Sequence, residues 1–95
     1  MDISLALRKV RFEKNAKQYD VAKKAKISAS YLSQVESGAK HPSQKLVEKL
    51  CKIYSIPYIV LVWYGTQESD VKKDKQSAFR IIKQPMDNFI SEFIK

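Results

Sequence analysis

The most informative part of this chain is QYDVAKKAKISASYLSQVESG, residues 18–38. Apolar side chains recur in it at helical spacing in two blocks, and Gly38 stands at its end. Ser28 is a good N-cap for the second block, because a serine oxygen can accept a bond from a backbone N–H of the first helical turn. The stretch therefore predicts two short helices, over about 18–25 and 29–36, joined by a tight turn. This arrangement is a helix-turn-helix.

The open face of the second helix carries small or planar side chains that form hydrogen bonds. Leu32 and Val35 are expected to point inward, and Tyr31 is expected to be partly exposed. The residues left on the open face are Ala29, Ser30, Ser33 and Gln34. Glutamine can bond adenine N6 and N7, serine several donors and acceptors, and alanine can contact a thymine methyl group. We therefore expect this face to read base edges in the DNA major groove.

The remainder of the chain also has helical patterning. Only two glycines and three prolines interrupt 95 residues, which predicts an all-α protein. Apolar periodicity predicts further helices over about 3–14, 44–54 and 57–63, so that residues 1–65 form a five-helix domain. The last of these helices is apolar on every side and needs cover from a partner subunit or from the C-terminal tail.

A polar linker, residues 66–77, and a helical tail, residues 78–95, are predicted to follow the domain. Apolar residues recur in the tail at spacings of three and four, as in a heptad seam, and Ile90 and Ile94 widen the seam. Pro85 is expected to kink the helix or to make it restart. The tail would either fold back on its own domain or pair with a second chain. The candidate dimer-interface residues are Tyr58, Ile59, Val62, Trp63, Phe79, Ile82, Met86, Phe89 and Phe93.

Charge is concentrated in the first part of the chain. The whole sequence has 18 Lys and Arg against 10 Asp and Glu, a net charge of +8. Residues 1–65 hold 12 basic and 5 acidic residues, a net charge of +7, whereas residues 66–95 hold 6 and 5, a net charge of +1. A strongly basic domain before a nearly neutral tail indicates a polyanion as the partner of the domain.

The composition argues against several other classes of protein. Cys51 is the only cysteine and His41 the only histidine, so we expect no disulfide, metal site or cofactor. No pair of carboxylates, nucleophile with a base or phosphate-binding glycine loop is visible, and we therefore expect no enzyme. The apolar run 58–64 is too short to span a bilayer, and the chain does not begin like a signal peptide. On these grounds we expect the protein in the cytoplasm.

Residues 18–43, QYDVAKKAKISASYLSQVESGAKHPS, carry a resemblance to a known family. The glutamine, the spaced Val-Ala, the Ser-x-Ser-Tyr-Leu-Ser run, Glu-x-Gly and Pro-Ser resemble the Xre/Cro-repressor-like helix-turn-helix family of phage repressors and bacterial regulators. The resemblance extends over residues 3–62 and leaves the tail outside it. It implies a repressor-like DNA-binding domain of five helices.

The resemblance also implies roles for individual residues. Arg11 and Glu36 would form an ion pair between the first and third helices, and Gln18 would brace Gln34 or a neighbour. The residues expected at DNA phosphates are Lys17, Gln18, Ser28, Tyr31, Lys40 and Lys45.

The sequence departs from the family pattern at two lysines. Lys17 stands at the usual N-cap position, although its side chain cannot accept a hydrogen bond. Lys26 replaces the usual turn glycine and must therefore adopt a left-handed conformation at some cost.

Together these observations predict a sequence-specific regulator of transcription that binds double-stranded DNA. We expect a repressor that binds a palindromic operator as a homodimer, with half-sites about 34 Å apart. The alternative is an antitoxin or accessory regulator whose C-terminal tail binds a protein partner.

Overall fold

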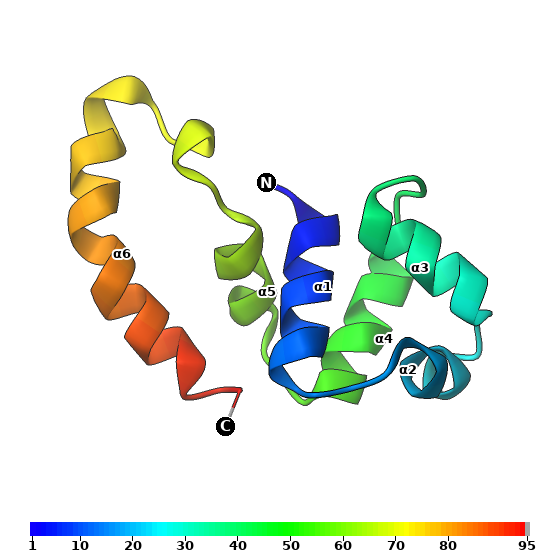
Figure 1. The fold of residues 1–95 in the computed structure, drawn as a ribbon. Coiled ribbons are helices and arrows are strands. Elements are labelled where there is room, and N and C mark those ends of the chain that lie inside the picture. The colour runs from blue at the N-terminus through cyan, green and yellow to red at the C-terminus, as the bar shows by residue number, and fades with distance from the viewer. Residues whose placement is uncertain (95) are drawn as a thin grey trace.

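The computed structural model describes residues 1–94, and this part of the chain is helical with no strand (Figure 1). Residue 95, the last of the predicted tail, lies outside the described residues. The α-helices are α1 (Ile3–Glu13), α2 (Gln18–Ala25), α3 (Ala29–Ser37), α4 (Gln44–Tyr54), α5 (Tyr58–Gly65) and α6 (Gln76–Ser91). The prediction of an all-α, five-helix domain with a helical extension is confirmed.

Short polar side chains begin three of the helices. The hydroxyl oxygens of Ser28 and Ser43 accept bonds from backbone N–H groups three residues further on, at 2.9 and 3.1 Å. The carboxylate of Asp2 caps α1 in the same way at 3.0 Å. Each such cap stabilises a helix by about 1 kcal/mol, because it satisfies an N–H group that has no partner within the helix.

The two lysines that depart from the family pattern lie at the two ends of α2. Lys17 is the N-cap residue and makes no capping bond with its side chain. Lys26 ends the helix in the left-handed region at φ 60°, as the sequence predicts. A side chain in that region costs roughly 1–2 kcal/mol relative to a right-handed residue, so the turn before α3 is strained. Asn15, which follows α1, and Gly38, which follows α3, adopt the same left-handed conformation at φ 53° and 88°.

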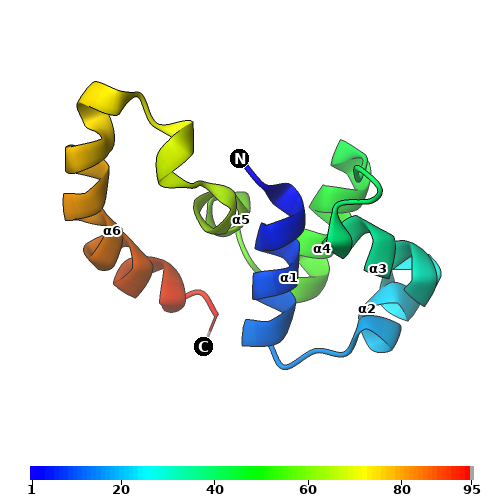
Figure 2. The same ribbon diagram turned by 45° about the horizontal axis from the view of Figure 1, so that its top comes forward.

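One apolar core receives side chains from all six α-helices. Its fully buried members include Leu7, Val10, Ala25, Leu32, Val35, Leu50, Val60, Leu61 and Ile90. Since Ile90 belongs to α6, the tail packs on the domain of its own chain. Figures 1 and 2 both show α6 beside α5 and on the opposite side of the molecule from α3.

Residues 66–75, within the predicted linker, contain two 3-10 turns, Glu68–Asp70 and Lys73–Lys75. Asp70 holds this segment to the start of the chain, because its carboxylate accepts a bond from the Met1 ammonium group at 2.7 Å. The helix of the tail begins at Gln76, two residues before the predicted start of the tail. The division into domain, linker and tail stays a prediction.

Pro85 lies inside α6 and the helix does not restart there, although a restart was one of the two predicted outcomes. The other outcome, a kink, stays a prediction. The helix is continuous from Gln76 to Ser91. Proline removes the bond to the carbonyl of residue i−4, here Ile81. Both Pro85 and Ile81 lie on the exposed side of the helix, with Ile81 75% exposed, so water can reach that carbonyl.

The predicted apolar seam of the tail has two sides in the structure. Phe79 and Ile90 are buried against the domain, and Met86 is half-buried. Residues on the other side remain exposed, namely Ile82 at 48%, Phe89 at 58% and Phe93 at 36%. A stripe spaced by threes and fours covers a wide arc of a helix, and a single packing partner covers only part of that arc.

The apolar helix α5 is covered in part by α6. The ring of Trp63 packs on Phe79 with 5.6 Å between ring centroids, and its Nε1–H donates to Asp87 at 2.7 Å. Tyr58 and Ile59, near the start of α5, remain 45% and 51% exposed. The prediction that α5 needs cover beyond its own five-helix domain is therefore met by the tail on one side of the helix.

Candidate nucleic-acid interface

The outer side of α3 presents three polar side chains to solvent. Ser30, Ser33 and Gln34 are exposed, whereas Leu32 and Val35 on the opposite side are fully buried. The exposed residues lie three and four positions apart, so they share one side of the helix. This side is free of bulky and charged groups and can therefore approach another surface closely.

Two of the predicted contact residues on α3 are less accessible. Ala29 and Tyr31 are half-buried and pack against the apolar core. Ala29 still lies in the first turn of α3, next to Ser30. Among the four predicted base-reading residues, it therefore offers the smallest accessible surface.

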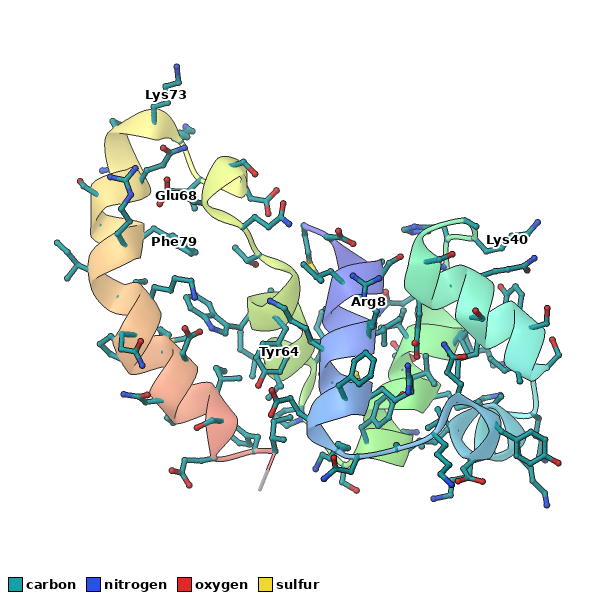
Figure 3. The ribbon with its side chains drawn as sticks, in the orientation of Figure 1. Arg8, Lys40, Tyr64, Glu68, Lys73 and Phe79 are labelled. Atoms are coloured by element: carbon teal, nitrogen blue, oxygen red, sulfur yellow. The ribbon has the colours of Figure 1, made fainter. Side chains whose placement is uncertain are left out.

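The lysines predicted at DNA phosphates are exposed. Lys17 precedes α2, Lys45 lies in the first turn of α4, and Lys40 lies in the loop between α3 and α4. The backbone N–H of Lys40 donates to the carbonyl of Gln34 at 3.1 Å, which holds the loop against the end of α3. Figure 3 shows the Lys40 side chain extending away from the molecule. All three side chains are exposed to solvent, and the loop that carries Lys40 adjoins the end of α3.

Two other predicted phosphate contacts use their polar atoms within the protein. The hydroxyl of Ser28 accepts the N-cap bond of α3 and keeps its own proton free to donate. The Gln18 side-chain nitrogen donates to the Glu36 carboxylate at 3.0 Å. The residue that Gln18 braces is therefore Glu36 and not Gln34.

A buried ion pair joins α1 to α3. Arg11 Nε donates to both carboxylate oxygens of Glu36, at 3.0 and 2.8 Å, and these residues are only 9% and 2% exposed. Arg11 also donates to the carbonyl of Ala16 at 3.0 Å. Arg8 donates to the backbone carbonyl of Glu36 at 3.1 Å, and Figure 3 shows it on α1 beside α3. These bonds fix the end of α3 relative to α1 and α2.

Tyr54 is a neighbour of this pair that the sequence did not single out. Its hydroxyl is buried and has no hydrogen-bond partner among the described residues. Burial raises the pKa of the Tyr54 hydroxyl strongly, and the negative charge of Glu36 raises it further, against a smaller lowering by Arg11. The phenol therefore stays protonated beside the ion pair. The predicted helix over about 44–54 includes Tyr54, but the apolar pattern of that helix carries no sign of the charge next to it.

Tyr19 and Lys23 also border the candidate interface. They line a shallow hollow beside the turn between α2 and α3, together with Ser28. Tyr19 is 67% exposed, which is high for an aromatic residue. Its position in the first turn of α2 was the only feature of the sequence that could have indicated its place beside the candidate interface.

The chain belongs to the Xre/Cro-like helix-turn-helix family. The model of this family, described as helix-turn-helix, matches residues 7–61, more than half of the chain. The family consists of DNA-binding regulators of transcription, and its match covers α2, α3 and α4, most of α1 and half of α5. No curated protein and no solved structure matches the chain.

Two further findings concern the described part of the chain. No helix within residues 1–94 has the length and apolar character needed to cross a membrane. Across the same residues, no group of three or more His, Cys, Asp and Glu side chains is arranged to hold a metal ion.

Proposed function

We propose that this protein is a sequence-specific repressor that binds double-stranded DNA and recognises a palindromic operator as a homodimer. The observation that carries the proposal is the outer side of α3. It presents Ser30, Ser33 and Gln34 to solvent on a helix that a buried ion pair holds in place. The second helix of a helix-turn-helix enters the major groove, where such side chains can bond base edges.

The proposed base contacts differ between the ends of α3. Ala29 and Ser30 lie in the first turn, which reaches deepest into the groove in this type of docking. Ser33 follows one turn later, next to Gln34, whose amide group suits an adenine. Each good contact of this kind discriminates between bases by about 1–3 kcal/mol.

The exposed lysines supply the part of the affinity that does not depend on sequence. Lys17, Lys40 and Lys45 would neutralise phosphates on either side of the groove, and the free protons of Ser28 and Gln18 would add hydrogen bonds. Tyr31 would contribute its exposed edge. Contacts of this kind position a protein on the duplex and make binding dependent on salt.

A homodimer is proposed because one copy of α3 offers few base contacts. Two copies facing two half-sites double the number of bases that are read, and a twofold dimer requires a palindrome. Exposed apolar residues on α5 and α6 provide surface for such an association, among them Tyr58, Ile59, Ile82, Phe89 and Phe93. Trp63, Phe79 and Met86 pack between α5 and α6 or against the core of their own chain instead, and the half-buried Val62 contributes at most an edge.

The second candidate is an antitoxin or accessory regulator whose tail binds another protein. The exposed apolar side of α6 favours it, because such a surface also fits a foreign helix. DNA binding through α3 is common to both candidates.

Selection of bound fragments from a random duplex library tests the proposal. A repressor of this kind yields a palindromic consensus whose half-sites are separated by about one helical turn or a multiple of it. Recovery of fragments without a shared sequence would reject base reading by α3. A consensus without symmetry would reject the homodimer on DNA and leave base reading intact.

A further inference from the structure

The exposed side of α6 is an apolar stripe of four residues. Ala78, Ile82 and Phe89 lie four and seven positions apart on the helix, and Phe93 follows in the turn after its end. The rings of Phe89 and Phe93 pack edge to face with 5.5 Å between centroids, which continues the stripe past the end of α6. All four side chains are exposed. Exposed apolar surface of this extent marks an interaction site more often than an ordinary surface.

No charged residue lies on the stripe. Between residues 78 and 93 the charged side chains are Arg80, Lys83, Asp87 and Glu92, and none of them is one of the four stripe residues. Arg80 is paired with Glu68 at 2.7 Å, and Lys83 is paired with Asp87 at 2.8 Å. Arg80 and Asp87 lie on the opposite side of the helix from the stripe, as the 3.6-residue period requires. The four side chains of the stripe are apolar and therefore suit an apolar helix.

The order of side-chain sizes along the stripe is self-complementary. Positions 78 and 93 lie symmetrically about a point between residues 85 and 86, and so do positions 82 and 89. If a second α6 is laid antiparallel about that point, each Phe93 faces an Ala78 and each Phe89 faces an Ile82. Large side chains thus meet smaller ones at every level, which allows two helices to approach closely.

We propose that the α6 stripe pairs with the α6 stripe of a second copy of this chain, antiparallel and with the twofold axis near Pro85 and Met86. The inference deepens the homodimer of the proposed function and rests on it. A contact of this kind is isologous, since residue 78 meets residue 93 and residue 93 meets residue 78. Pro85 has no backbone N–H to satisfy, so its place near the axis costs no hydrogen bond.

The inner side of α6 would couple this pairing to the DNA-binding domain. Ile90 is fully buried, Trp63 Nε1 donates to Asp87 at 2.7 Å, and Phe79 packs on Trp63. At the far end, Lys14, the residue after α1, donates to the carbonyl of Phe93 at 3.5 Å. The stripe is therefore presented by a helix with a defined orientation relative to α3. Since α6 has only four to five turns, we expect a dimer that dissociates at micromolar concentration.

Cysteine cross-linking of the full chain tests the register. The single native thiol, the buried Cys51, is first replaced in a Cys51→Ala background. Chains with Ala78→Cys are then mixed with chains carrying Phe93→Cys under mild oxidation. The antiparallel register predicts mixed disulfide dimers at least tenfold in excess over either homodimer, because equal positions lie about 20 Å apart along the helix. Preferential 78–78 cross-links, or no cross-link above that of urea-unfolded chains, would overturn the proposal.

Charge insertion provides the second test. Phe89→Glu should raise the dimer dissociation constant at least 100-fold in analytical ultracentrifugation, because two glutamates would face an apolar partner. Gln84→Glu on the polar side of α6 is the matched control and should change it less than threefold. Equal dimerisation of both variants would overturn the proposal, provided that circular dichroism shows both folded. If the protein binds DNA with base specificity but does not dimerise through α6, only this inference is refuted. If it dimerises through α6 but shows no preference between DNA sequences, the proposed function is refuted.

Discussion

The outer sides of α3 and α6 are both exposed helix surfaces, yet their chemistry is opposite. α3 presents serines and a glutamine to solvent, Lys40 lies in the loop at its end, and a buried ion pair supports it from behind. α6 presents alanine, isoleucine and phenylalanine without a charge, and a tryptophan and an isoleucine support it from behind. The first surface suits the base edges and phosphates of DNA, the second another apolar helix. The exposure of a helix surface therefore does not identify its partner, whereas the chemistry of the side chains on that surface does.

The largest expected effect concerns the support of α3. Glu36→Ala leaves the Arg11 guanidinium buried without its partner, and we expect the free energy of unfolding to fall by about 3–5 kcal/mol. Urea unfolding followed by circular dichroism measures the loss. Glu48→Ala, which removes an exposed carboxylate of α4, is the control and should cost no more than about 0.5 kcal/mol. A loss below about 1 kcal/mol for Glu36→Ala would show that the ion pair does not hold α3.

The next effect tests whether α6 is part of the same cooperative unit as the domain. Ile90→Ala removes a fully buried side chain of α6 and should destabilise the protein by about 2–4 kcal/mol. Ile81→Ala, on the exposed side of the same helix, should cost only about 0.5 kcal/mol. If both variants unfold like the parent, the tail does not contribute to the stability of the domain.

The third prediction separates base reading from phosphate contact on the α3 side. Gln34→Ala should lose about 1–3 kcal/mol of discrimination at one base pair of each half-site and little affinity for other sequences. Lys40→Ala should weaken all sequences alike and reduce the slope of log K against log salt by about 0.9 for each chain bound. Titrations of matched and mismatched duplexes at several salt concentrations measure both. Identical behaviour of the two variants would contradict the assignment of α3 as the reading helix.

The smallest effect concerns the contact between α6 and Trp63. Burial raises the pKa of Asp87, but bonds from Lys83 and Trp63 outweigh it and lower the pKa below its ordinary value of 3.8. A carboxylate with a lowered pKa stabilises the folded state fully above its unfolded pKa, and this contribution is lost as pH falls through the folded value. We therefore expect a change in the fluorescence of Trp63, the only tryptophan, that begins below pH 3.8. Asp87→Asn should remove this transition, and an unchanged transition would assign it to another group.

The helix-turn-helix could be predicted almost residue by residue, whereas the tail could not. Local signals were strong in the first case: Ser28 and Ser43 cap their helices, Gly38 ends α3, and even the strain at Lys26 follows from the lack of a glycine. The roles of the base-reading and phosphate residues stay predictions, because the structure gives the positions of these side chains but no contact with a base or a phosphate. In the tail, the apolar residues spread over a wide arc of the helix, and the pattern did not show which of them would face inward. The partner of each side depended on contacts between residues far apart in the chain.

The sequence by itself determined the number of helices in the domain, most of their ends and the polar character of the outer side of α3. These features depend on interactions within one or two helical turns, where capping, left-handed residues and 3.6-residue periodicity act. Only the tertiary structure decided that Gln18 bonds Glu36, that the Tyr54 hydroxyl lies beside the ion pair without a hydrogen-bond partner among residues 1–94, and which side of α6 packs on Trp63. Such contacts depend on how whole helices pack together. A local pattern limits that packing but does not select it.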